Sequence, residues 1–324
     1  MPVTIRIATT GGPGVLKAET VEEQHPSAGE VWIEQDAIGV NYLDVTQRNG
    51  SVPVPLPSGL GLEAAGRVKS IGADVDNVAI GDRVAYILGP AGGYASGRLY
   101  PAKRLVRVPD TISSDDVATV LFKGITAHYL IHSTFAVGPG TTVLLYGAAG
   151  AVGQILIRWA KSLGAFVIGV VSKEASAARA TSAGCDAVLV WGACDLPAEV
   201  TKLTDGRKVD VVYDGIGKPT FLASLDSLRP RGLMVSIGAS AGPPDPVTVG
   251  MLNAKGSLYL TRPGLAAHAT DLTEYRQRAD AVFEAVLAGI IKPVAWKTFP
   301  LSEAAAAHAA LESGKSKGAV LLKP

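Results

Sequence analysis

The first third of the chain consists of short stretches in which apolar and polar residues alternate imperfectly. Residues 1–7, 31–38, 64–71, 83–87 and 105–108 are predicted as strands. Gly and Pro interrupt these stretches often, and such residues mark turns because they favour special backbone conformations. Short strands separated by such turns are typical of a small, curled β-domain.

The pattern changes to a helical one near residue 113. Ser114 offers a side-chain oxygen for the helix N-cap, and Asp115 and Asp116 place negative charge in the first turn. Apolar residues at helical spacing continue to Leu130, and the region ends at Gly138-Pro139-Gly140. The pattern predicts one long helix.

From residue 140 onward, apolar runs alternate with helical patterns such as residues 154–163 and 221–228. Continuous apolar runs are expected for strands that helices cover on both faces. The alternation predicts a doubly wound, parallel sheet. Its six predicted strands are residues 142–146, 166–171, 187–190, 209–213, 233–237 and 257–261.

The last part of the chain does not continue the parallel pattern. It reads as a helix over residues 275–287, a strand at 294–296, a helix at 303–311 and a final strand at 319–322. We expect this segment to pack back onto the N-terminal domain, which would make the parallel-sheet domain an insertion.

Composition narrows the classes of protein. Hydrophobic residues make up 48% of the 324 residues and charged residues 18%, so the chain is expected to fold. The formal net charge of +1 gives no overall attraction to nucleic acid or membranes, and no apolar run reaches about twenty residues. The start lacks the pattern of a signal peptide, and two cysteines cannot form a disulfide framework. We therefore expect a cytoplasmic protein with no membrane or nucleic-acid partner.

A glycine motif follows the strand that ends at residue 146. Gly147, Gly150 and Gly153 have the spacing G-x-x-G-x-x-G, with a strand before them and a helix after them. Glycines there let the backbone approach a pyrophosphate, whose charge is stabilised by the helix N-terminus. The motif predicts a dinucleotide site, although such glycines are also found in plain turns.

The residues after the next strand indicate which dinucleotide binds. Sites selective for NAD usually place Asp or Glu there, to accept from the ribose 2′-hydroxyl. This chain has Ser172 and Lys173, which favour the 2′-phosphate of NADP. Arg179 would add to this effect, unless it is an ordinary surface charge. NADPH is the predicted cofactor.

Zinc-assisted dehydrogenases need thiolate or imidazole ligands from the smaller domain. The first third of the chain has no Cys, and its only His is His25. His128 and His132 lie one helical turn apart, but a third ligand is missing and they are interpreted as helix-surface residues. No metal is predicted.

Five stretches along the chain carry a family resemblance. They are residues 39–44, 57–66, 122–126, 229–236 and 256–263. Together they resemble the zinc-free quinone oxidoreductases of the medium-chain dehydrogenase/reductase superfamily, which include ζ-crystallin. The resemblance extends over essentially the whole chain.

The resemblance implies an α/β fold made of a GroES-like, β-rich catalytic domain and a doubly wound, parallel-sheet Rossmann domain. The catalytic domain would comprise residues 1–125 and 266–324, and the NADPH-binding domain residues 126–265. It also implies a homodimer that holds NADPH in the cleft between the domains.

The same resemblance implies functional residues. Asn41, Asp44 and Lys123 would be catalytic. The cofactor would bind Asn41 and Lys123 as well as Thr126, Gly147, Gly150, Ala151, Val152, Gly153, Ser172, Lys173, Gly215, Ile216, Ile237, Gly238, Ala239, Leu260, Thr261, Arg262 and Lys315.

Several of these residues have simpler interpretations. Asn41 could bind backbone in a turn, and Asp44 could cap a helix or form a salt bridge. Lys123 could extend its ammonium to the surface, and Arg262 could be structural.

The chain also departs from the family pattern. Family members often carry tyrosines where this chain has Thr46 and, a little further on, Ser51-Val52. The usual cofactor Lys falls near Ser176 and the usual Tyr at Trp191. The usual C-terminal Arg falls near Gly314, where Lys315 and Lys317 are close enough to replace it.

The predicted activity is zinc-independent hydride transfer from NADPH to a quinone or a similar electron-poor acceptor. The first alternative is an NADPH-dependent enone or alkenal reductase, which the missing tyrosines favour. The second is an NADPH-sensitive RNA-binding or crystallin-like protein.

Overall fold

The computed structural model describes residues 1–324 and divides into two compact units. Unit 1 comprises Met1–Lys123, Asp271–Ala288 and Lys292–Pro324, and unit 2 comprises Gly124–Thr270 and Gly289–Ile291. The domain limits predicted from the sequence, after residues 125 and 265, lie two and five residues from these boundaries. Helix α2 (Ser114–Tyr129) contains the first boundary.

A mixed sheet of seven strands forms the frame of unit 1. Its strand order is β15-β16-β3-β5-β6-β8, and β7 pairs with β3 outside this path. The bounds are β3 (Glu30–Val40), β5 (Glu63–Ile71), β6 (Arg83–Ile87), β7 (Gly97–Pro101), β8 (Val106–Arg107), β15 (Ala295–Pro300) and β16 (Ala319–Lys323).

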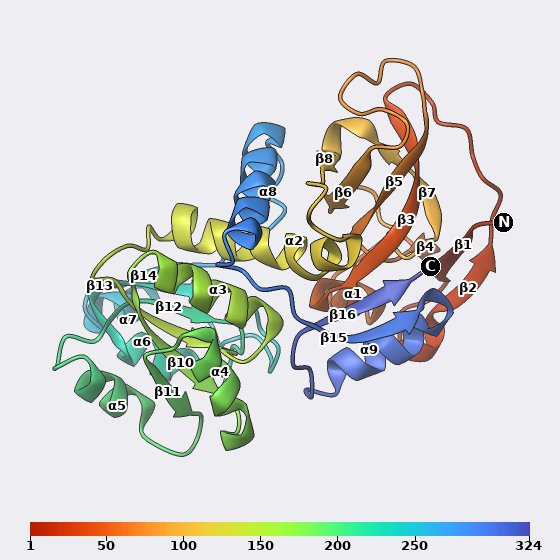
Figure 1. Ribbon diagram of the computed structural model, residues 1–324. Coiled ribbons are helices and arrows are strands. Elements are labelled where there is room, and N and C mark those ends of the chain that lie inside the picture. The colour runs from red at the N-terminus through yellow and green to blue at the C-terminus, as the bar shows by residue number, and fades with distance from the viewer. The chain divides into compact units, whose positions relative to one another are not determined.

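The C-terminal segment completes this sheet. Strand β16 pairs antiparallel with β3, with Val320 opposite Val40, and β15 pairs parallel with β16. In Figure 1 these blue strands lie beside the red and orange strands from the start of the chain. The expectation that the last part of the chain returns to the N-terminal domain is confirmed.

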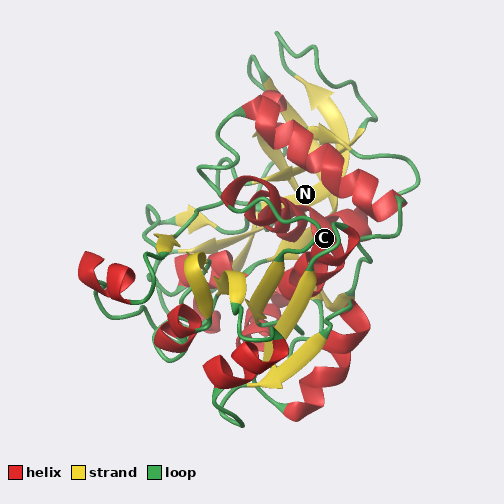
Figure 2. Cartoon of the chain, turned by 90° about the vertical axis from the view of Figure 1, so that its left-hand side faces the viewer, coloured by secondary structure: helices red, strands yellow, loops and turns green.

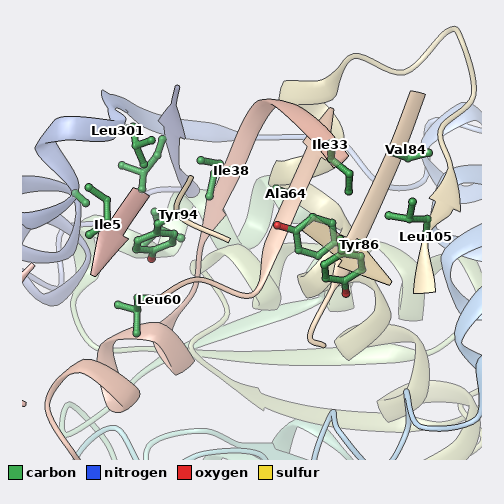
Figure 3. Close-up of a cluster of buried hydrophobic side chains, with 14 of the residues drawn as sticks. Ile5, Ile33, Ile38, Leu60, Ala64, Val84, Tyr86, Tyr94, Leu105 and Leu301 are labelled. Atoms are coloured by element: carbon green, nitrogen blue, oxygen red, sulfur yellow. The ribbon is translucent and has the colours of Figure 1, made fainter. Parts of the chain in front are cut away.

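A second, smaller sheet in unit 1 covers part of the same core. It has the order β2-β1-β4, from β1 (Val3–Ile7), β2 (Lys17–Thr20) and β4 (Ser58–Gly59). Figure 3 shows the buried side chains of this core, among which Ile5, Leu60, Tyr94 and Leu301 lie at one end. Helices α1 (Tyr42–Arg48), α8 (Leu272–Leu287) and α9 (Ala304–Glu312) complete the unit.

Unit 2 contains a parallel sheet of six strands in the order β11-β10-β9-β12-β13-β14. The bounds are β9 (Thr142–Tyr146), β10 (Phe166–Val171), β11 (Ala187–Val190), β12 (Val209–Asp214), β13 (Leu228–Ser236) and β14 (Tyr259–Thr261). All six predicted strands are therefore present. The order reverses at β9, which is the topology of a doubly wound nucleotide-binding sheet.

Helices pack against both faces of this sheet, as Figure 2 shows in red beside the yellow strands. Because parallel crossovers are right-handed, reversing the strand order after β11 moves the later helices to the opposite face. The helices are α3 (Ala151–Ser162), α4 (Ala177–Ala183), α5 (Leu196–Leu203), α6 (Phe221–Asp226) and α7 (Val249–Ala254).

Three local predictions are corrected. The N-cap of α2 is Ser113, whose hydroxyl accepts from the Asp116 N–H at 3.0 Å, while Ser114 donates to Asp36. Strand β8 has only two residues, because a 3₁₀ turn at Ala102–Arg104 precedes it and Pro109 follows soon after. Helix α3 begins at Ala151, three residues before the predicted start.

None of the helices combines the length and the apolar character that crossing a membrane requires.

Candidate active site

Asn41 lies where the central strand of unit 1 ends and a helix begins. Strand β3 stops at Val40, α1 starts at Tyr42, and Asn41 is the buried N-cap between them. Its Nδ2 donates to Glu63 Oε2 at 2.8 Å, and its Oδ1 accepts from Lys123 Nζ at 2.9 Å. Both ends of the carboxamide are therefore fixed by charged partners, so Asn41 does more than bind backbone in a turn.

Glu63 is a member of this site that was not predicted. It opens β5, is buried, and accepts from the Phe122 N–H at 2.8 Å through Oε1. Gly39 makes room for the carboxylate, because a Cβ there would lie 2.1 Å from Glu63 Oε2. A sequence signal was available, because Glu63 directly precedes the small apolar residues Ala64 and Ala65, and a Glu that is buried with such neighbours needs polar partners.

Lys123 extends from α2 into the same buried group. Its Nζ lies 3.5 Å from Glu63 Oε2, and the two side chains are 6% and 1% exposed. The interpretation that this lysine reaches the surface is wrong. We call Asn41, Glu63 and Lys123 the Lys123 cluster, in which the two charges compensate each other inside the protein.

Asp44 lies one helical turn after Asn41 and is fully buried. Its Oδ2 accepts from the Asn41 N–H and from the Tyr94 hydroxyl, each at 2.8 Å. The helix-capping interpretation is thus confirmed, because the bond to Asn41 is one half of a capping box. Burial raises the pKa of Asp44 to about 7, although both hydrogen bonds oppose this shift.

Four further residues continue from Asp44 and were also not predicted. The Tyr94 hydroxyl lies 2.9 Å from His308 Nε2, and His308 Nδ1 lies 3.3 Å from Arg48 Nη1. Arg48 pairs with Glu312 through two bonds of 2.8 Å. Burial and the neighbouring Arg48 charge lower the pKa of His308 to about 4, so the imidazole is neutral near pH 7.

Unit 2 carries the predicted glycine motif at the end of β9. Gly147 has φ +67°, and a Cβ on Gly153 would lie 2.3 Å from the Gly147 carbonyl oxygen. Gly150 is the N-cap of α3, no side chain caps this helix end, and its first turn, which begins with Ala151 and Val152, has no acidic residue. The Gly150 N–H donates to the Gly147 carbonyl at 2.8 Å, so the free N–H groups are those of the first helical turn, including Ala151 and Val152. They form a cradle that suits a pyrophosphate.

The other predicted cofactor residues of unit 2, apart from Thr126 on α2, follow the carboxyl ends of parallel strands. Such ends lie along one edge of the sheet, which is where ligands bind in this class of fold. These residues are Ser172 and Lys173 after β10, Gly215 and Ile216 after β12, Ile237, Gly238 and Ala239 after β13, and Leu260, Thr261 and Arg262 at the end of β14.

Charged side chains near this edge have distinct surroundings. Ser172 and Lys173 are exposed, and Arg179 donates to Ser176 Oγ at 3.1 Å. Arg262 Nη1 lies 3.3 Å from Ser236 Oγ. Lys315, the remaining predicted residue, is exposed and belongs to unit 1.

No group of three or more His, Cys, Asp and Glu side chains could hold a metal ion. His128 and His132 have ring centroids 4.5 Å apart, and both pack edgewise against Trp159.

The positions where the family often carries tyrosine are occupied by small groups. The Thr46 hydroxyl donates to the Leu43 carbonyl at 2.8 Å, so it is used within α1. Ser51 and Val52 are exposed.

Comparison with known proteins gives this geometry a context. Residues 27–110 match the alcohol dehydrogenase GroES-like domain, and residues 151–262 match the zinc-binding dehydrogenase domain. A quinone oxidoreductase of Pseudomonas aeruginosa is 40% identical over 325 residues and all of both chains. A 2-haloacrylate reductase of a Burkholderia species is 42% identical over 97% of this chain and 96% of its own. The crystal structure of Escherichia coli quinone oxidoreductase complexed with NADPH is 40% identical, with a TM-score of 0.96 over 99% of this chain and 100% of that one.

Proposed function

Because the chain belongs to the quinone oxidoreductase family of the medium-chain dehydrogenase/reductase superfamily, we propose that it reduces a quinone or a similar electron-poor acceptor with NADPH. The observation that carries the proposal is the Lys123 cluster, which holds a buried ammonium group on a fixed carboxamide at the end of β3. The free N–H groups at the start of α3 supply the matching cradle for a dinucleotide.

Bound NADPH would supply the hydride, and the residues of the chain would orient the reactants and stabilise charge. Ala151 and Val152 would donate N–H groups to the pyrophosphate, and Gly150, which has no side chain, would allow its close approach. Lys173 would bind the 2′-phosphate. Lys123 would stabilise negative charge that develops on the acceptor oxygen, since its position is fixed before the reaction begins. This role needs no zinc, and the N-terminal third contains no cysteine to hold one.

The test is the loss of NADPH absorbance with 1,4-benzoquinone, 9,10-phenanthrenequinone and a simple enone, repeated with NADH. Rapid loss with a quinone and NADPH is the expected result. NADPH binding without turnover on any acceptor would contradict the proposal and favour the binding-protein alternative.

An Asn41→Ala variant tests the site itself. Removing the carboxamide takes away one partner from Lys123 and one from Glu63, so kcat/KM should fall by about tenfold or more while the fold persists. The matched control is Asn49→Ala at the exposed C-cap of the same helix, which should keep its activity. Equal activity of the two variants would remove Asn41 from the mechanism.

A second activity is favoured by particular observations. Thr46, Ser51 and Val52 offer no phenol to stack on a quinone ring, and the Burkholderia relative is a 2-haloacrylate reductase. We therefore include α,β-unsaturated carbonyl compounds among the candidate acceptors. A higher kcat/KM for the enone than for either quinone would make reduction of an activated double bond the main reaction.

We also propose that the protein acts as a homodimer in the cytoplasm. Strand β14 is an edge strand that pairs only with β13, and its Tyr259 is 62% exposed. Val249 on the preceding helix is 84% exposed. An apolar, unpaired edge of this kind supports pairing with a second copy. Light scattering should give the mass of two chains, and a fluorescent fusion should distribute through the cytoplasm.

A further inference from the structure

A continuous line of buried polar groups connects Asp44 to the surface of unit 1. It runs from Asp44 on α1 through Tyr94, which lies between β6 and β7, to His308 on α9, and then to Arg48 and Glu312. We call these five residues the Asp44 chain. Asp44, Tyr94 and His308 are fully buried, and Arg48 is nearly so.

Arg48 determines the direction of every hydrogen bond in this chain. A guanidinium group can only donate, so His308 Nδ1 must accept from it. The proton of the neutral imidazole is then on Nε2, which donates to the Tyr94 oxygen. Tyr94 is left with one hydroxyl proton, and it donates this proton to Asp44 Oδ2.

These bond directions exclude a proton relay. A relay requires each member to accept a proton on one side as it releases one on the other. A guanidinium group donates hydrogen bonds without releasing its protons, so none can pass from it to His308 Nδ1. His308 and Tyr94 therefore form a fixed series of donors that ends at Asp44 Oδ2.

Packing holds this series of donors in place. The Tyr94 N–H donates to the Leu60 carbonyl at 2.8 Å, and the Tyr94 carbonyl accepts from the Ile5 N–H at 2.8 Å. Figure 3 shows the Tyr94 ring among Ile5, Leu60 and Leu301. Gly61 has φ +92°, and a Cβ there would lie 2.2 Å from the Tyr94 ring. A side chain at residue 61 would therefore displace the ring.

Asp44 is also next to the Lys123 cluster. Its Oδ2 accepts a hydrogen bond from the Asn41 N–H. Through space, the negative charge of Glu63 raises the pKa of Asp44 and the positive charge of Lys123 lowers it. Its other oxygen, Oδ1, is buried without a protein partner. The charged and titratable groups around Asp44 are thus Glu63 on β5, Lys123 on α2, Tyr94, Arg48 on α1, and His308 and Glu312 on α9.

We propose that Tyr94 and His308 are positioning residues. They hold the Asp44 carboxylate, and through it the first turn of α1 with Asn41, in the orientation on which the reductase reaction depends. This assignment rests on the function proposed above.

The test is Tyr94→Phe, with Tyr100→Phe as the matched control. Both tyrosines are fully buried in unit 1, but the Tyr100 hydroxyl donates to the Leu88 carbonyl and is not part of the Asp44 chain. Loss of the Tyr94 donor destabilises the ionised form of Asp44, so its titration should move to higher pH by about one unit. Tyr100→Phe should leave this titration unchanged.

Two measurements monitor the titration of Asp44. One is the ¹³C NMR shift of the Asp carboxyl carbons against pH, in which the Asp44 signal is the one lost in Asp44→Asn. The other is kcat/KM against pH, where the inflection that belongs to Asp44 should move in the same direction, whichever protonation state supports turnover. A Tyr94→Phe variant with both curves unchanged would overturn the proposal.

His308 is tested by its conservative variant. In His308→Gln an amide N–H replaces the Nε2–H donor to Tyr94, whereas His308→Leu offers none. Turnover should therefore fall about tenfold in the Leu variant and recover several-fold in the Gln variant. Equal losses in both would overturn a positioning role for His308. Absence of NADPH oxidation in the unsubstituted chain would instead contradict the proposed function.

Discussion

The two candidate regions of this protein are built in opposite ways. In unit 2 nearly all the predicted cofactor residues follow strand ends, so short stretches of sequence carry them to one edge of the sheet. In unit 1 the buried site joins residues that are far apart in sequence. Tyr94 and His308 are separated by 214 residues, and Arg48 and His308 by 260.

The two regions differ because a bound pyrophosphate and a buried charged side chain need different kinds of partner. A pyrophosphate is held by backbone N–H groups at a helix start, which require small residues and little else. A buried ammonium or carboxylate group requires compensating partners, and these come from whichever elements pack against it. The first kind of site is a local property of the chain, and the second depends on the tertiary structure.

The largest effect is expected when a charge of the Lys123 cluster is removed. Lys123→Met leaves the buried Glu63 carboxylate without a counter-charge and should lower the free energy of unfolding by about 3–5 kcal/mol. Lys17→Met on the exposed strand β2 is the control and should change it by less than about 0.5 kcal/mol. Denaturant titration followed by circular dichroism measures both.

The double variant Glu63→Gln/Lys123→Met separates lost charge from lost packing. With both charges absent, it should recover a large part of the stability that Lys123→Met loses. A double variant no more stable than Lys123→Met would show that the two charges do not compensate each other.

This difference between local and tertiary sites explains which elements and site residues could be predicted from the sequence. The six parallel strands were predictable because most of them are continuous apolar runs, and Gly147, Gly150 and Gly153 follow the first of them. Asn41 and Lys123 were found through a family resemblance. Glu63 lay within one of the stretches that carried the resemblance, but nothing local showed that it faces Asn41. Tyr94 and His308 meet only because α9 returns to unit 1 after the whole of unit 2, and no local pattern predicts that contact.

The second-largest effect concerns how folding stability depends on pH, because Asp44 and His308 of the Asp44 chain contribute to it with opposite signs. The pKa of Asp44 is raised from 3.8 to about 7, so its contribution to stability is present below pH 4 and is lost as pH rises through 7. The pKa of His308 is lowered from 6.5 to about 4, so its contribution is present above pH 6.5 and is lost as pH falls through 4. Each amounts to about 3–4 kcal/mol, and between pH 4 and 6.5 they largely cancel.

Replacing Asp44 or His308 removes one of the two titrating groups, so each variant should show the pH dependence of stability that the other group causes. Relative to the unsubstituted chain, Asp44→Asn should gain stability as pH rises from 4 to 7. His308→Gln should lose stability as pH rises from 4 to 6.5. Thermal unfolding midpoints at half-unit pH steps measure both slopes. Parallel curves for all three proteins would contradict the assignment of these pKa shifts to the Asp44 chain.

The smallest effect is expected at the exposed edge of unit 2, where water screens each charge. Lys173→Ala should raise the Kd for NADPH by about fivefold and leave the Kd for NADH unchanged, since only NADPH carries the 2′-phosphate. The control is Lys202→Ala on α5, where the ammonium is exposed and pairs with Glu199. Because Arg179 lies on α4 near the same edge, some preference for NADPH should persist in Lys173→Ala. An equal loss of affinity for both dinucleotides would place Lys173 on a part of the cofactor that they share. The exposed region would then contribute to dinucleotide affinity, and the choice of cofactor would depend on other residues.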